Sequence, residues 1–172
     1  MTVFVSNEQN DQPVAIERWQ QLALDVLQAE GVDGECEMSL LFVDEETIAE
    51  LNNRFMGSIG PTDVLSFPID GEPTTPGRWP DVAGPAPGRV DVDPDDLPVL
   101  LGDVVVCPKV AHTNAPTHAG SYDDELALLI VHGILHLMGM DHAIDDERIA
   151  MQARERELLD AYWGQLSADP WK

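Results

Sequence analysis

The segment 121–139, SYDDELALLIVHGILHLMG, constrains the fold more than any other part of the sequence. Ser121 with Asp124 three residues later is typical of a helix start, and Gly139 is a typical helix stop. Beyond the first turn, nearly every residue between them is apolar, on all sides of the expected helix. A helix that is apolar all round is a core helix, so we expect the other elements to cover it.

The remaining sequence contains strands and helices that can do so. Apolar runs and alternations predict four strands, at 2–6, 35–43, 62–69 and 100–107. Helical spacing and end signals predict further helices at 14–30, 44–55, 108–118 and 145–163. In a chain of 172 residues, this order favours a single α+β domain with a central mixed sheet of roughly four strands flanked by helices.

Residues 70–100 do not follow this pattern. They contain seven of the thirteen prolines, four glycines and several aspartates, without any periodicity. Such a segment cannot bury enough apolar surface to order itself. We therefore expect a flexible, solvent-facing insertion loop within the single domain of residues 1–172.

Three of the five histidines lie on the central helix or just after it: His132, His136 and His142. Residues four apart on a helix share one face, and the turn at Gly139 can bring His142 back to the same point. Three imidazoles with a fourth position left for water are typical of a catalytic zinc site. The pattern predicts one zinc ion per chain, with its bound water as the nucleophile.

The same histidine spacing occurs in metzincin proteases, which place a glutamate directly after the first histidine as the general base. Here that position is Gly133. A zinc peptidase or amidase remains an alternative on spacing, but it lacks this carboxylate.

Three sequence blocks together resemble the YbeY family. HGILHLMGMDH (132–142) closely resembles the family signature H-G-x-L-H-L-x-G-Y-D-H. PTDVLSFP (61–68) and LGDVVVC (101–107) are similar to two further family blocks, in the same order. The resemblance covers essentially the whole chain apart from residues 70–100.

This resemblance implies a bacterial, cytoplasmic, metal-dependent endoribonuclease that cleaves single-stranded RNA. It would act in ribosomal RNA maturation, notably at the 3′ end of the small-subunit RNA, and in ribosome quality control. It also implies an α+β fold with a mixed four-stranded sheet, and zinc ligands at His132, His136 and His142. The implied partners are ribosomal RNA and the small ribosomal subunit or its assembly factors.

A third possibility is a non-catalytic ribosome-assembly factor with a structural metal. Structural zinc usually has four protein ligands, so a fourth ligand, such as Cys107 or Asp141, would favour it. In an enzyme, Asp141, Asp63 or Asp103 could act as the general base, although each can equally be a turn, cap or strand residue. We take Asp141, which is next to the predicted ligand His142, as the candidate base that acts with the three histidines.

The chain has 32 acidic and 9 basic residues, a net charge of −23. Such a surface resists nonspecific nucleic-acid binding, so RNA contact would depend on a few local cations, for which we expect Arg54 and Lys109. The YbeY family commonly has Arg-Gly just before its P-T-D block, where this sequence has Met56 and Gly57.

No apolar run is long enough to cross a membrane, and the first residues lack signal-peptide features. We therefore expect a cytoplasmic protein without a membrane segment. In that compartment Cys36 and Cys107 are expected to be reduced, buried thiols.

Overall fold

The computed structural model describes residues 1–32, 34–69 and 99–172. Its strands are β1 (Thr2–Asn7), β2 (Cys36–Phe42), β3 (Val64–Pro68) and β4 (Val99–Val106). Its helices are α1 (Ile16–Ala29), α2 (Glu45–Met56), α3 (Pro108–Asn114), α4 (Tyr122–Leu137) and α5 (Asp145–Tyr162), with a 3₁₀ turn η3 (Ala115–Thr117) after α3. The predicted α+β class and four-stranded sheet are confirmed.

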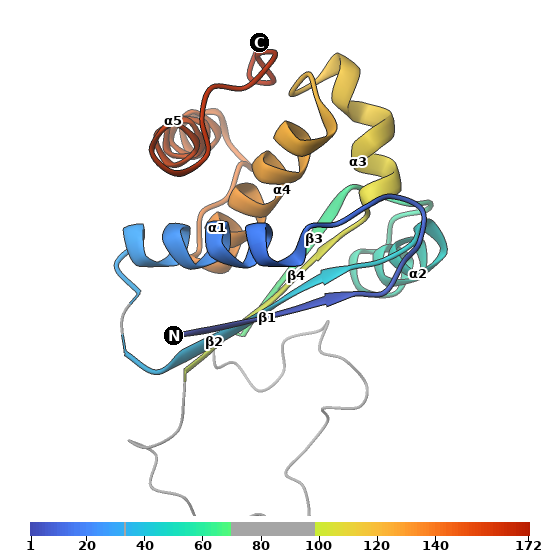
Figure 1. The fold of residues 1–172 in the computed structure, drawn as a ribbon, viewed down its shortest axis with the longest axis horizontal. Helices are drawn as coiled ribbons and strands as arrows, with labels where there is room; N and C mark the ends of the chain where they lie inside the picture. Colours follow the sequence, from blue (N-terminus) through green and yellow to red (C-terminus); the bar gives the residue numbers. More distant parts are fainter. Residues whose placement is uncertain (33, 70–98) are drawn as a thin grey trace, which may run out of the picture.

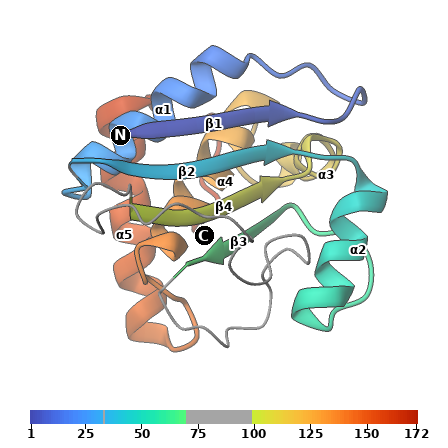
Figure 2. The same ribbon diagram turned by 90° about the horizontal axis from the view of Figure 1, so that it is seen from below.

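The strands form one mixed sheet in the order β1-β2-β4-β3. β1 pairs with β2 and β2 with β4 in parallel, whereas β3 is antiparallel to β4. Parallel neighbours in a sheet need a crossover connection, and α1 forms the one between β1 and β2. Figure 2 shows α1 and α4 behind the strands, on the same face of the sheet.

Helix α4 is the centre of the fold. It packs against β3 and β4 and also against α1, α3 and α5, and Figure 1 shows it running between the sheet and α5. Most of its side chains from Leu126 to Leu137 are buried. The expectation of an apolar helix covered by the other elements is therefore confirmed.

The opposite face of the sheet has a smaller core beneath α2. Ile48 and Leu51 of α2 pack there with Leu65 and Phe67 of β3 and Val105 of β4. The neighbours of Val105 in β4 face the α4 side instead, because successive strand residues point to opposite faces. Asp44 caps α2 by accepting a hydrogen bond from the Thr47 amide (2.8 Å), which begins the helix where the sequence predicts.

Several predicted boundaries lie one or two residues from those in the structure, and two further points concern the helix at 108–118 and the loop at 70–100. The helix expected over 108–118 ends at Asn114 and continues only as the turn η3, because Pro116 has no N–H to continue the α-helical bonding. Strand β4 begins at Val99, so the last two residues of the predicted loop 70–100 are strand. The rest of that predicted loop, 70–98, lies outside the described residues.

Two further expectations concern the cysteines and membrane-spanning segments. Cys36 and Cys107 are both buried, and no disulfide joins them. Among the helices in the described ranges, none has the length and apolar character needed to cross a membrane.

Candidate metal centre

The helix α4 and the turn after it bring the three predicted ligands together. His132 and His136 lie one turn apart on α4, and Gly139 follows with a positive φ of 94°. The amide of Gly139 donates to the His136 carbonyl (3.0 Å) and that of Met140 to the Leu135 carbonyl (3.0 Å). This C-terminal turn reverses the chain and places His142 beside the other two rings.

The cluster is tight enough for one ion. The ring centroids of His132 and His136 are 4.6 Å apart, and that of His142 lies 5.5 Å and 5.1 Å from them. One ring nitrogen from each histidine lies within 4.8 Å of the others, and the Nε2 atoms of His132 and His136 are 3.1 Å apart. Nitrogens on a tetrahedral zinc are separated by about 3.3 Å, given bonds of about 2.0–2.1 Å. The donor set and its spacing therefore fit a zinc-like ion.

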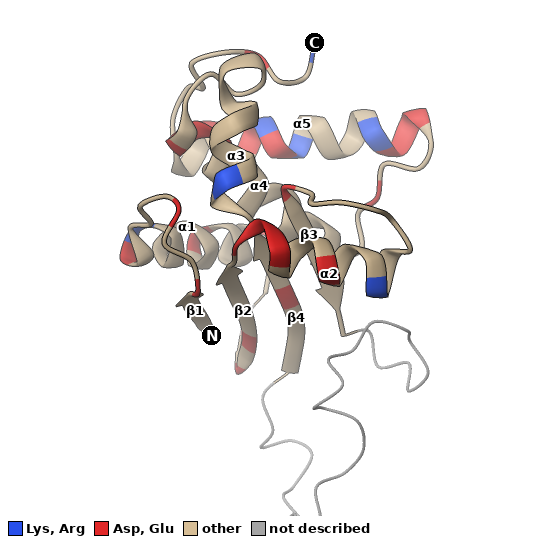
Figure 3. Cartoon of the chain, turned by 90° about the vertical axis from the view of Figure 1, so that its right-hand side faces the viewer, with Lys and Arg blue, Asp and Glu red and all other residues tan. Residues whose placement is uncertain are grey.

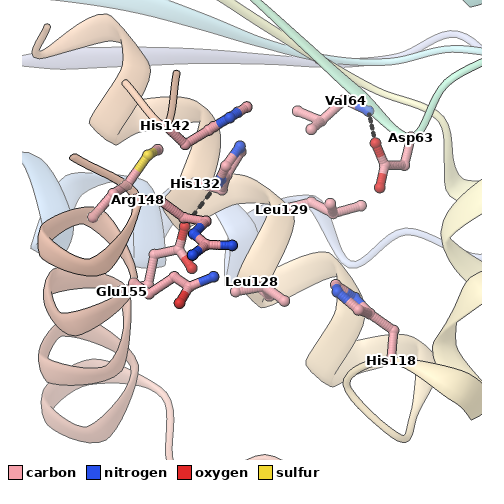
Figure 4. A pocket seen from close by; sticks show the side chains of 11 residues that line it. Asp63, Val64, His118, Leu128, Leu129, His132, His142, Arg148 and Glu155 are labelled. Atoms are coloured by element: carbon pink, nitrogen blue, oxygen red, sulfur yellow. Dashed lines mark hydrogen bonds and ion pairs between the residues drawn. The ribbon is translucent and has the colours of Figure 1, made fainter. Parts of the chain in front are cut away.

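A buried carboxylate orients His132. Its Nδ1 donates to Oε1 of Glu155 on α5 (2.7 Å), as the dashed line in Figure 4 shows. Glu155 is only 4% exposed. A carboxylate on the far nitrogen of a metal-binding histidine fixes the tautomer and the direction of the ring, so Nε2 of His132 is left to face the cluster.

His136 is held in the neutral form that a ligand requires. Burial lowers its pKa below the ordinary histidine value, and the neighbouring His132 and His142 lower it further. Asp141 and the Met140 backbone oppose this shift without reversing it. An unprotonated imidazole can bind a metal without first releasing a proton.

The histidines lie where two clefts meet. The larger, about 670 Å³, runs along β3 and is bordered by all three histidines and by Met56. The smaller, about 290 Å³, opens between α4 and α5 and shares His132 and His142 with the first. A substrate strand can therefore approach the cluster from two directions.

The three candidate bases are placed differently. Asp63 borders both clefts, and its Oδ1 accepts the Val64 amide (2.8 Å). Asp141 borders the larger cleft and accepts the His142 amide (2.7 Å), as a turn residue does. Asp103 pairs with Phe67 in the sheet and is not among the described residues that border either cleft.

The two predicted RNA-contacting cations, Arg54 and Lys109, contact other side chains of the protein. Lys109 forms an ion pair with Glu45 (2.9 Å), and the Arg54 guanidinium lies over the ring of Phe55 (5.5 Å). Neither is among the described residues that border the two clefts.

The sequence analysis missed a cation in the smaller cleft. Arg148, in the first turn of α5, borders that cleft, and its half-exposed side chain pairs with Asp145 (3.2 Å). Figure 4 shows Arg148 lining this cleft together with His132 and Glu155. Figure 3 shows that α5 carries acidic and basic residues together along its length, so its composition alone does not single out Arg148. The sequence signal that could have identified Arg148 is its position, six residues after His142 at the start of a predicted helix.

Glu155 was missed although the sequence contains a signal for it. The buried residues of α5 are Met151, Glu155, Leu158 and Leu159, a spacing that defines one helix face. Glu155 is thus a carboxylate within the apolar stripe of α5, and such a group needs a partner. The partner itself could not be read from the sequence.

The chain is similar to proteins of one family. Residues 4–163 match the protein family described as Endoribonuclease YbeY. The chain is 46% identical over 163 residues to the Endoribonuclease YbeY of Acidothermus cellulolyticus, covering 94% of this chain and 92% of that protein. It is 45% identical over 159 residues to that of Thermobifida fusca, covering 92% of each. The solution structure of TM1509 from Thermotoga maritima has a similar fold, with a TM-score of 0.56 and 25% identity, over 95% of this chain and 90% of that one.

Proposed function

Because the chain belongs to the endoribonuclease YbeY family, we propose that it hydrolyses phosphodiester bonds of single-stranded ribosomal RNA at the cluster of His132, His136 and His142. The observation that carries this proposal is the convergence of three histidines at the junction of two clefts. The biological step is maturation of small-subunit RNA, notably its 3′ end, together with ribosome quality control.

The three histidines would hold one zinc ion. When bound, this ion supplies Lewis-acid activation of water and of a phosphoryl oxygen. His132 and His136 contribute Nε2 atoms 3.1 Å apart, and Glu155 keeps the His132 ring in the required orientation. Three nitrogen ligands beside open clefts suit a catalytic site better than a closed structural one.

Two further residues have roles in the proposed reaction. Asp63 borders both clefts and can accept a proton from an attacking water, a role that the sequence also allows for Asp141. Arg148 borders the smaller cleft, where its guanidinium can pair with a backbone phosphate of the RNA. Arg54 and Lys109 remain predicted RNA contacts, although neither is among the described residues that border the two clefts.

The net charge of −23 indicates that the protein binds RNA weakly by itself. We propose that the small ribosomal subunit or one of its assembly factors presents the RNA strand, in the cytoplasm. Binding then depends on presentation and on a few cations close to the clefts.

The peptidase alternative is disfavoured by the residue at position 133. A Cβ at Gly133 would lie 2.6 Å from Cγ1 of Val104 and 3.3 Å from Oγ of Ser66. This position therefore faces the sheet, and no general-base glutamate of the metzincin type can occupy it.

The test compares two substrates with one preparation of protein. Zinc-loaded wild-type protein is incubated with a single-stranded fragment of small-subunit RNA and, separately, with a mixed peptide library. We expect RNA cleavage that a chelator stops and that His132→Ala abolishes. Peptide hydrolysis with no cleavage of RNA would overturn the proposed function.

A further inference from the structure

The segment that follows α5, residues 163–172, reaches back to the candidate metal centre. Glu155 receives two hydrogen bonds, one on each oxygen. Oε1 accepts from Nδ1 of His132 (2.7 Å), and Oε2 accepts from Nε1 of Trp171 (2.8 Å). Trp171 is thereby connected to a predicted metal ligand through a single buried side chain.

Several contacts hold Trp171 in this position. Its indole ring lies under the guanidinium of Arg156, with 4.6 Å between the carbon Cζ and the ring centroid. Its backbone amide donates to Oδ1 of Asp169 (2.9 Å), and Asp169 pairs with Arg156 (3.7 Å). The indole N–H is thus presented to Glu155 from a fixed direction.

We propose that Trp171 is a positioning residue for the metal centre: its indole N–H holds the Glu155 carboxylate in the plane that directs Oε1 at His132. This inference rests on the assignment of His132 as a ligand in the proposed function. It adds that the segment after α5 sets the metal affinity, although that segment lies outside all three motif blocks.

Losing this hydrogen bond has two opposing effects on metal affinity. A carboxylate with one acceptor bond fewer is a stronger base and would polarise the His132 N–H more. However, Glu155 is only 4% exposed, so its freed Oε2 atom would lose its donor in a buried position, and such a group is destabilised. The carboxylate is then free to rotate, and rotation removes the acceptor from His132. We therefore expect weaker metal binding.

Trp171→Phe tests this directly, because it keeps an aromatic ring and removes the indole N–H together with the five-membered ring that carries it. The matched control is Trp163→Phe. Trp163 also donates its indole N–H to a buried carboxylate, that of Asp124 (2.8 Å), which makes no contact with the histidine cluster among the hydrogen bonds of the described residues. Each variant loses one hydrogen bond from an indole N–H to a buried carboxylate, but only Trp171→Phe removes the one to Glu155.

The first measurement is Zn²⁺ affinity by competition with a chelator. Trp171→Phe should bind Zn²⁺ about threefold to tenfold more weakly, the effect of one ordinary hydrogen bond, whereas Trp163→Phe should stay within about twofold of wild type. Glu155→Gln, which removes the acceptor charge itself, should weaken binding by about 10- to 100-fold. Equal affinities of Trp171→Phe and Trp163→Phe would overturn the proposal.

The second measurement concerns the His132 ring in metal-free protein. Long-range ¹H–¹⁵N spectra should show one tautomer, protonated at Nδ1, in wild type and in Trp163→Phe. They should show a mixture of tautomers in Trp171→Phe. A purely structural role of Trp171 would leave the tautomer unchanged and contradict the proposal.

The third measurement needs no substitution and so does not depend on the variants folding. During a Zn²⁺ titration of wild-type protein, the indole N–H resonance of Trp171 should shift more than that of Trp163. Equal shifts would overturn the positioning role while the proposed function stands. Absence of Zn²⁺ binding by wild type would instead contradict the proposed function itself.

Discussion

Gly133 of α4 lies so close to Val104 of β4 that a Cβ added at position 133 would be 2.6 Å from Cγ1 of Val104. On the same side, Oγ of Ser66 donates to the Gly133 carbonyl (3.0 Å). These contacts determine how deeply α4 sits on the sheet. Since His132 is the adjacent residue, they also determine how the metal cluster meets β3.

Gly133→Ala should therefore destabilise the protein despite improving helix propensity. Overpacking a core typically costs about 1–3 kcal/mol, and replacing a helical glycine by alanine returns about 1 kcal/mol. The difference between the two is a net loss of up to about 2 kcal/mol in the free energy of unfolding, measured by urea denaturation. In a Val104→Ala background, which makes room for the new methyl group, the same substitution should instead stabilise the protein by up to about 1 kcal/mol, because only the gain in helix propensity remains. An equal loss in both backgrounds would show that the Val104 contact is not the cause.

Asp124 should make the stability depend on pH in the acid range. Burial acts to raise its pKa, but hydrogen bonds from Ser167 and Trp163 outweigh burial, and the pKa is lowered below its usual value. The folded state thus favours the ionised form. The resulting stabilisation is present above the ordinary aspartate pKa of about 3.9, and it is lost as the pH falls through the lower, folded-state value.

Asp124→Asn measures this contribution. At about pH 7 the variant should lose about 1–3 kcal/mol of unfolding free energy, as expected for hydrogen bonds to a charged acceptor. The difference from wild type should shrink once the pH falls below about 4. A difference that stays constant throughout the acid range would contradict the lowered pKa.

Arg148→Gln should weaken RNA binding in a salt-dependent manner. Each phosphate contact contributes about −0.7 to the slope of log affinity against log salt concentration for single strands, so the slope should become shallower by about that amount. The charge-matched control is Arg18→Gln on α1, whose side chain is about as exposed (51% against 52%) and pairs with Asp123. Arg54→Gln and Lys109→Gln in the same assay test the cations predicted from the sequence. Equal slopes for Arg148→Gln and wild type would remove Arg148 from the RNA contact.

Zn²⁺ should raise the thermal stability of wild-type protein but not that of His136→Ala. A ligand that binds only the folded state stabilises it by about 2.7 kcal/mol at a hundredfold excess over its dissociation constant. His112→Ala is the control, because His112 lies beside Tyr122 and outside the cluster. Melting curves with and without Zn²⁺ give the comparison. A zinc-dependent shift that persists unchanged in His136→Ala would contradict the assignment of this ligand.

The features that the sequence predicted correctly are those encoded by neighbouring residues. The apolar character of 126–138 placed α4 in the core, and the four-residue spacing of His132 and His136 with the turn at Gly139 predicted the convergence of the rings. The early end of α3 was also encoded locally, by Pro116, but the prediction did not use this signal. All of these depend on interactions within a few residues.

The features that escaped prediction depend on contacts between distant segments. The His132–Glu155 pair joins α4 to α5 across 23 residues, and the sequence pattern reveals only that Glu155 is a carboxylate on a buried face. Trp171 meets Glu155 only because the chain folds back after α5. The packing of Gly133 on Val104 likewise depends on the strand order, which no local pattern encodes.

The most direct test of the metal-dependent cleavage is a titration of metal-free wild-type protein with Zn²⁺ while cleavage of a single-stranded small-subunit RNA fragment is followed. The account predicts that cleavage rises with zinc occupancy and saturates at one ion per chain, and that His136→Ala stays inactive at the same concentrations. Cleavage of the RNA by the metal-free protein, unaffected by chelator and by His136→Ala, would contradict it.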